Sequence, residues 1–179
     1  MRNILGVLLL VSFLAPAAAA SDPASSDPYP RGELFGGYSY LYSNAGQSGG
    51  SFSGGAASIT ENIRPWFGGV FDFSTQWHSG ANVTTFGYGP VFAYRKDPKI
   101  TPFVHILGGG VRGSVEYLNI SKAETTWSVM AGGGLDVKVA RGLAVRLFQA
   151  DYVFSHFSGV HQDNFRVSVG LVYRFGYGR

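Results

Sequence analysis

The chain has 179 residues, enough for one domain, with a formal net charge of +3 and no cysteine. The absence of cysteine excludes disulfides and thiolate metal sites, and so small and scattered a positive charge argues against nucleic acid as a partner. Charged residues make up only 14% of the chain, below the roughly 25% of an average soluble domain.

Residues 1–20 are predicted to be a secretory signal peptide. Arg2 supplies the positive start, an apolar stretch follows, and Ala18 and Ala20 give the small-x-small pattern of a cleavage site. The apolar stretch is shorter than the about 20 residues of a membrane helix, and an uncleaved anchor helix is the alternative. Residues 21–32 contain three prolines and are predicted to form an extended or disordered leader.

From residue 33 onward, strand-like segments alternate with turn residues. Eight such segments are recognisable, most of them close to the roughly 9–11 residues with which a tilted strand crosses a bilayer. We predict strands at 33–43, 54–63, 66–77, 84–95, 101–115, 125–139, 143–155 and 164–175. The strand domain would span residues 33–175 and be followed by a short tail at 176–179.

The predicted connections alternate in length along the chain. Short turns are expected at 64–65, 96–100 and 140–142, and longer, more polar loops at 44–53, 78–83, 116–124 and 156–163. Short turns at one end and longer loops at the other are typical of outer-membrane barrels, in which the long loops are extracellular. An even number of strands would then place both termini in the periplasm.

Five of the segments carry a bulky apolar row opposite a smaller and more polar row. In the last segment Phe165, Val167, Val169, Leu171, Tyr173 and Phe175 share one face, and Arg166, Ser168, Gly170, Val172 and Arg174 share the other. Eight strands enclose an interior that is only wide enough for packed side chains, so the glycine-rich row fits inside and the aromatic row must face outward. An outward apolar row requires lipid, and the pattern therefore predicts a membrane-spanning barrel.

Three segments leave the orientation of their side chains open. In the second, Glu61 shares the apolar row, and we place it at the periplasmic rim. In the fifth, His105 and Arg112 fall on opposite rows, which a bulge in the glycine run between them would reconcile. In the seventh, Arg146 either extends to the rim or points inward across the tight turn toward Asp136, with a bulge farther along the strand.

Six charged side chains are predicted to point into the lumen. They are Asp72, Asp136, Lys138, Asp151, Arg166 and Arg174. Asp151 and Arg166 lie nearly symmetrically about the last loop, so they are placed to meet across adjacent strands. We interpret the set as an ion network that fills a narrow lumen, with a narrow ion-conducting pore as the alternative.

His156 and Ser158 are weak candidates for catalysis. They lie two residues apart, as a base and a nucleophile on one face of a strand would, but the last strand offers no carboxylate to orient the histidine. A polar surface loop explains them more simply, and a lipid-A-modifying membrane enzyme is the alternative. No metal site is expected, because the spacing of the four histidines is irregular, and no cofactor is implied.

The segment from Ser168 to Phe175 also carries a resemblance to a known family. Ser168, Gly170, Tyr173 and Phe175 are similar to the carboxy-terminal signal of outer-membrane barrels: a polar residue, a glycine two positions on, and two alternating aromatics. With the signal peptide, the chain resembles the OmpA- and OmpX-like eight-stranded barrels, although this chain continues for four residues beyond the terminal aromatic.

The resemblance implies an all-β fold, an eight-stranded antiparallel up-and-down transmembrane barrel in the outer membrane of a Gram-negative-type bacterium. It implies as partners the outer-membrane lipids and the outer-membrane assembly machinery, which reads the last strand. We expect a non-enzymatic protein with a structural or surface-interaction role; the sequence names no extracellular ligand.

Overall fold

The computed structural model describes residues 29–44, 50–78, 80–117, 120–157 and 160–177, with the backbone alone for strand residues at 115–123 and 156–162. The predicted signal peptide, its cleavage residues Ala18 and Ala20 and most of the predicted leader lie outside these residues. No helix within the described ranges is both long enough and apolar enough to cross a membrane.

The described residues form eight β-strands that close into one antiparallel barrel in the order of the sequence. The strands are β1 (Pro30–Ser43), β2 (Gly50–Arg64), β3 (Phe67–His78), β4 (Ala81–Ala93), β5 (Ile100–Tyr117), β6 (Ile120–Ala140), β7 (Leu143–Phe157) and β8 (Val160–Tyr177). Pairing of β1 with β8 closes the barrel. The predicted fold class, an eight-stranded up-and-down barrel, is confirmed.

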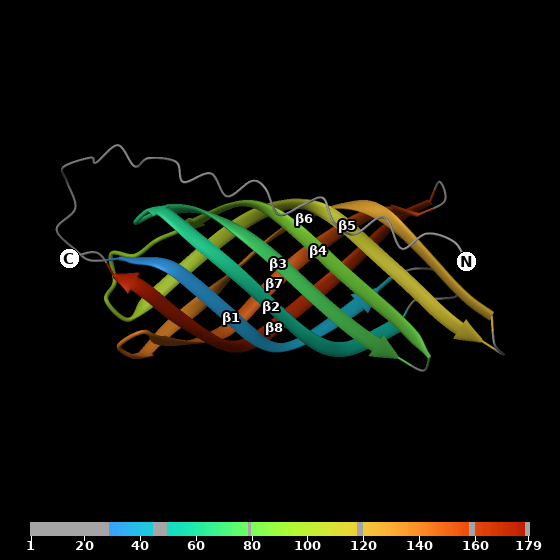
Figure 1. Ribbon diagram of the computed structural model, residues 1–179, viewed down its shortest axis with the longest axis horizontal. Helices are drawn as coiled ribbons and strands as arrows, with labels where there is room; N and C mark the ends of the chain where they lie inside the picture. Colours follow the sequence, from blue (N-terminus) through green and yellow to red (C-terminus); the bar gives the residue numbers. More distant parts are fainter. Residues whose placement is uncertain (1–28, 45–49, 79, 118–119, 158–159, 178–179) are drawn as a thin grey trace, which may run out of the picture.

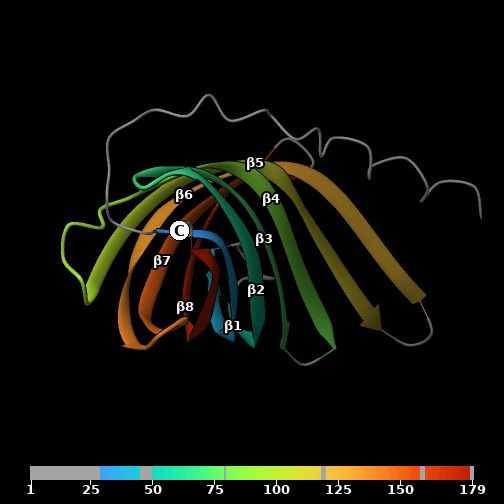
Figure 2. The ribbon, with the colours of Figure 1, turned by 60° about the vertical axis from the view of Figure 1, so that its left-hand side comes forward.

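The strands run obliquely around the barrel axis, and the two described chain ends lie at the same end of the barrel (Figure 1). The turns after β2, β4 and β6 share that end, which we call the terminal end. The hairpin of β5 and β6 projects farthest at the opposite end, as Figure 2 shows from a second side. We call this second end the hairpin end.

The hairpins are longer than predicted and their connections are shorter. Predicted loops 116–124 and 156–163 are instead largely strand, because β5 and β6 pair as far as Tyr117 and Ile120, and β7 and β8 as far as Phe157 and Val160. Past the part of the barrel that carries outward apolar side chains, water can contact both faces of a strand. The alternation of apolar and polar residues then disappears from the sequence, although the backbone hydrogen bonds between the strands continue.

The ends of the strand domain also differ from the prediction. β1 begins at Pro30, inside the predicted leader, and β8 runs to Tyr177, inside the predicted tail. Pro30 pairs with Tyr177 across the closing seam, so the extra residues at the two ends are held by each other.

Two of the three ambiguous strands, β7 and β5, are resolved by the register of the ladders. The register shifts between Arg146 and Gln149 against β8, which turns Arg146 into the lumen, so the inward alternative is the one that the structure adopts. The bulge expected in the glycine run of β5 is wrong, since the ladder of β5 with β6 is continuous from Ile100 to Tyr117. His105 simply faces the lumen and Arg112 faces outward near the hairpin end.

The lumen holds apolar as well as polar side chains. One buried apolar cluster consists of Val70, Val91, Ala93, Phe103, Leu107, Val111, Met130 and Val153, and a smaller one of Phe35, Ala56, Ala144 and Val172. Close backbone contact at the closing seam requires glycine, because a Cβ on Gly170 would lie 2.3 Å from the carbonyl oxygen of Gly36. The facing Gly37 is equally restricted, since its Cβ would lie 2.0 Å from the carbonyl oxygen of Val169.

Candidate functional site

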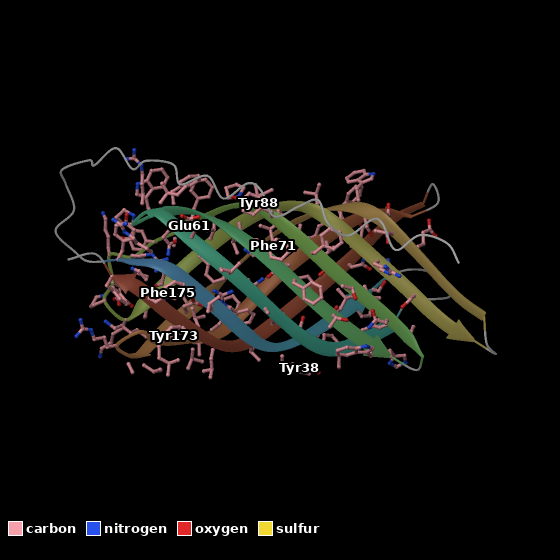
Figure 3. The ribbon with its side chains drawn as sticks, viewed as in Figure 1. Tyr38, Glu61, Phe71, Tyr88, Tyr173 and Phe175 are labelled. Atoms are coloured by element: carbon pink, nitrogen blue, oxygen red, sulfur yellow. The ribbon has the colours of Figure 1, made fainter. Side chains whose placement is uncertain are left out.

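The outer surface of the barrel carries large apolar side chains, as the row pattern predicts. Figure 3 shows Tyr38, Phe71 and Tyr88 projecting away from the ribbon. Exposed side chains on the last strand include Phe165, Val169, Leu171, Tyr173 and Phe175, while Arg166, Ser168, Val172 and Arg174 are buried. The predicted orientation, with aromatic rows outside and small or charged rows inside, is confirmed.

Two tyrosine hydroxyls on this outer surface are paired with serines of the neighbouring strand. The hydroxyl of Tyr38 donates to Ser53 at 2.8 Å, and that of Tyr40 donates to Ser51 at 2.6 Å. Glu61 is exposed on the outer row and lies toward the end of the barrel where Phe175 is found (Figure 3). Pairing leaves few bare hydrogen-bonding groups on this part of the surface, which an apolar solvent requires.

The centre of the lumen is organised around Arg166, which has no exposed surface. Its Nε and Nη2 donate to Oδ2 of Asp151 at 2.9 and 2.7 Å, and its Nη1 forms an ion pair with Oδ1 of Asp72 at 2.7 Å. Nη1 also donates to Ser74 and Thr85 at 2.8 and 3.3 Å. A side chain from β8 thus reaches β3 and β4 on the far side of the barrel and crosses the lumen.

His105 joins the same central layer. Its Nε2 donates to Oδ1 of Asp151 at 2.8 Å, and both side chains are almost entirely buried. Because Oδ2 of Asp151 also accepts from Gln149 at 2.9 Å, this single carboxylate receives hydrogen bonds from β5, β7 and β8.

A second layer lies around Asp136, nearer the terminal end. Asp136 accepts from Nε and Nη2 of Arg146 at 2.8 and 3.2 Å, and from Nη2 of Arg174 at 3.2 Å. The Arg146 guanidinium lies between the rings of Phe35 and Phe103, 4.4 and 4.3 Å from their centroids. Cation–π contact with two rings and a two-pronged carboxylate contact hold this arginine in one position.

A third layer closes the terminal end around Glu33. Glu33 pairs with Arg95 and lies 3.5 Å from Nε of Arg174, while Asn62 donates to it at 2.8 Å. Arg95 also donates to the carbonyl oxygen of Pro65 at 3.0 Å, which ties the ion pair to the turn between β2 and β3.

The three layers form one network along the lumen. Arg174 contacts both Glu33 and Asp136, and Gln149 links the second layer to the first by accepting from Arg146 at 2.6 Å and donating to Asp151. Among the described lumen residues, four carboxylates thus face four guanidinium groups, so the network is neutral when His105 is neutral. The cavity enclosed among these layers is about 20 Å³, room for roughly a single water molecule.

The structure brings together five of the six side chains predicted for the interior: Asp72, Asp136, Asp151, Arg166 and Arg174. Lys138 is the correction, because its side chain is exposed. It lies at the terminal end of β6, where the ladder with β7 shifts register between Lys138 and Ala140 and the packed lumen has ended.

Sequence reasoning missed Glu33 and Arg95 as members of the network. Both lie on the inward rows of their segments, opposite the aromatic rows. The alternation of inward and outward residues that predicted the other lumen charges therefore also predicts these two. His105 and Arg146 could not be assigned in the same way, because the sequence of their segments does not decide which row of side chains faces the lumen.

The residues of the predicted assembly signal all lie in β8. Ser168 is buried and donates to Ser39 on β1 at 3.0 Å, and Gly170 lies at the closing seam. Tyr173 and Phe175 face outward, with ring centroids 6.0 Å apart and planes inclined by 23°.

The weak catalytic candidates are not brought into a described site. The side chain of His156 and all of Ser158 lie outside the described residues. Within the described part of the chain no group of three or more His, Cys, Asp or Glu side chains is arranged to hold a metal ion.

Comparison with known proteins places the fold but names no family for the chain. No protein-family model matches the sequence, and no curated protein matches it. Among solved structures, the fold is similar to that of Neisserial surface protein A, with a TM-score of 0.71 and 9% identity over 83% of this chain and 100% of the other.

Two further structures show the same fold. Ail, the attachment invasion locus protein of Yersinia pestis, has a TM-score of 0.57 and 14% identity over 81% of this chain and 99% of that one. The outer membrane protein OprG of Pseudomonas aeruginosa has a TM-score of 0.57 and 8% identity over 83% and 97% of the two chains. The predicted resemblance to small outer-membrane barrels is confirmed at the level of the fold.

Proposed function

We propose that this chain is a non-enzymatic outer-membrane protein, a closed barrel that spans the bilayer with its strands and acts as a structural or surface-interaction scaffold. The observation that carries the proposal is the inverted arrangement of side chains. Tyr88 and Leu171 are 66% and 55% exposed on the outside, whereas Arg166 and Asp151 have no exposed surface inside. Only an apolar solvent around the barrel makes this arrangement favourable.

A closed lumen is supported by the network that fills it. Arg166 crosses the interior from β8 to β3 and β4, and Arg146 is held between two aromatic rings nearer the terminal end. An ion would have to break these buried contacts to pass, which favours a structural network over the alternative of a narrow pore.

The hairpin end is the part of the scaffold available for surface interactions. β6 has 21 residues and β5 has 18, well beyond the roughly 9–11 that cross a bilayer, so their hairpin extends past the apolar wall. With both termini in the periplasm, this end is extracellular, and any ligand would be bound there, since loops and hairpin tips on a rigid scaffold usually carry binding.

Assembly into the membrane is proposed to depend on β8. Its outward Tyr173 and Phe175 are accessible at the terminal end, and its inward Ser168 and Gly170 form part of the closing seam. We infer that the outer-membrane assembly machinery reads the aromatic pair, as the resemblance of this segment to the carboxy-terminal signal implies.

The test has two independent parts. The full chain, expressed in a Gram-negative host, is expected in the outer-membrane fraction and to migrate on unheated gels as a compact form that heating abolishes. Recovery in the soluble periplasmic fraction would refute membrane insertion. Purified protein in planar bilayers is expected to be silent at loads where a wide porin conducts; reproducible single-channel steps would refute the closed lumen.

A further inference from the structure

An apolar groove lies on the outer surface at the terminal end, between β4 and β5. It is a shallow depression, open to the outside, with a volume of about 330 Å³. Its lining is wholly apolar or aromatic and consists of Trp66, Phe92, Ala93, Tyr94, Pro102, Phe103 and Val104.

The groove follows from the different sizes of the outward side chains on the two strands. Phe92 lies in the outward row of β4 and Tyr94 follows just after the strand, whereas the neighbouring β5 presents the smaller Pro102 and Val104. Trp66 extends the wall, because its ring stacks on Phe92 with centroids 6.2 Å apart and planes inclined by 16°. The result is a groove beside a row of aromatic side chains, open to the outside.

Positive charge borders the groove where the wall meets the turn at 94–99. Nζ of Lys96 lies over the ring of Tyr94, 5.8 Å from its centroid. Lys99 is exposed in the same turn, and its carbonyl oxygen accepts from the backbone N–H of Lys138, whose side chain is also exposed.

One carboxylate, Asp97, lies in the same turn. Its Oδ1 accepts from the backbone N–H groups of Lys99 at 2.7 Å and Ile100 at 2.9 Å, and these hydrogen bonds hold the pKa of Asp97 below its usual value. It stays negative but is directed into its own turn. Lys96 and Lys99 against Asp97 leave the exposed charge of this turn positive.

We propose that this groove binds an anionic glycerophospholipid, with an acyl chain along the ring wall and the phosphate at Lys96 and Lys99. The inference rests on the proposed function, which places the terminal end in the periplasmic leaflet, where the lipids are phospholipids. An apolar trough that ends at ammonium groups is complementary to a molecule with an apolar tail and a negative head. Each lysine near a headgroup contributes about five-fold in affinity.

The test measures lipid retention by native mass spectrometry on the full chain in a neutral detergent. Phosphatidylglycerol and phosphatidylcholine with the same acyl chains are added separately to the wild type, to Lys96→Gln/Lys99→Gln, and to Arg112→Gln. The last variant removes an exposed cation near the hairpin end, far from the groove, and is the matched control. Val104→Trp fills the trough from an outward, 58% exposed position, so it leaves the lumen untouched.

We expect the wild type and Arg112→Gln to retain phosphatidylglycerol preferentially, and the double lysine variant to bind it about twenty-five-fold more weakly. Val104→Trp should lose retention of both lipids. Equal retention of the two lipids by the wild type, equal behaviour of the lysine variant and the control, or undiminished binding by Val104→Trp would each overturn the site. If the protein still fractionates with the outer membrane, such a result removes the lipid site and leaves the proposed function standing.

Discussion

Replacing Asp151 with alanine should destabilise the barrel more than any change on its outer surface. Asp151 is fully buried and accepts two hydrogen bonds from Arg166, one from Gln149 and one from His105. Without this carboxylate, Nε and Nη2 of Arg166 lose their acceptor, and the arginine keeps only the contacts of Nη1 with Asp72, Ser74 and Thr85. A fully buried guanidinium then has hydrogen-bond acceptors for only one of its three nitrogens.

The expected loss of stability follows from the buried charge of Arg166 that remains after the substitution. Removing one partner of a buried ion pair costs about 3–5 kcal/mol, because the remaining charge stays buried without compensation. Arg166 keeps Asp72, so we expect the lower end of this range, about 3 kcal/mol. Asp151→Asn preserves the shape and part of the hydrogen bonding and should cost less.

Asp163→Ala is the matched control, because Asp163 is an exposed carboxylate on β8 that accepts from the hydroxyl of Tyr152 at 2.5 Å. An exposed contact of this kind contributes about 1 kcal/mol or less. Urea unfolding from lipid vesicles can follow tryptophan fluorescence, since Trp66, Trp77 and Trp127 are all more than half exposed on the outside. A loss for Asp151→Ala equal to that of the control would refute a stabilising role for the central layer.

Two further changes test the seam and the second layer. Gly170→Ala places a Cβ 2.3 Å from a carbonyl oxygen of β1, so the closing strands must separate, and we expect a smaller fraction of the heat-sensitive compact form on gels. Arg146→Lys keeps the charge but loses the planar contact with Phe35 and Phe103 and the two-pronged contact with Asp136, and should lower the free energy of unfolding by about 1–3 kcal/mol in the same urea assay.

The orientation of most side chains could be predicted because it depends only on alternation. Tyr173 and Phe175 face outward and Arg174 inward for the same reason, a two-residue period between lipid and lumen. The lengths of the hairpins could not be predicted, since β5 and β6 continue past the apolar wall, where water lies on both sides and the period carries no signal.

The positions of β-bulges also could not be predicted from the sequence. Arg146 shares a row with outward aromatics in the sequence, and only a register shift before Gln149 turns it inward to Asp136. Nothing local marks that shift, because it is set by the neighbouring strands. Lys138 fails for a related reason: alternation assigns it to the lumen, but the packed interior ends before it.

The ion network also bears on how a barrel in lipid selects a single register. An apolar row gains little from choosing one apolar neighbour over another when the surrounding solvent is itself apolar. The interior ions distinguish registers sharply: Arg166 lies directly opposite Asp151, and a slip of β8 along β7 by two residues would place it opposite Gln149 or Val153. The outward row would be unchanged by that slip, whereas a buried charge would lose its partner at a cost of several kcal/mol. On this reasoning the outer row fixes which way each strand faces, and the charges in the lumen fix how far each strand is shifted against the next.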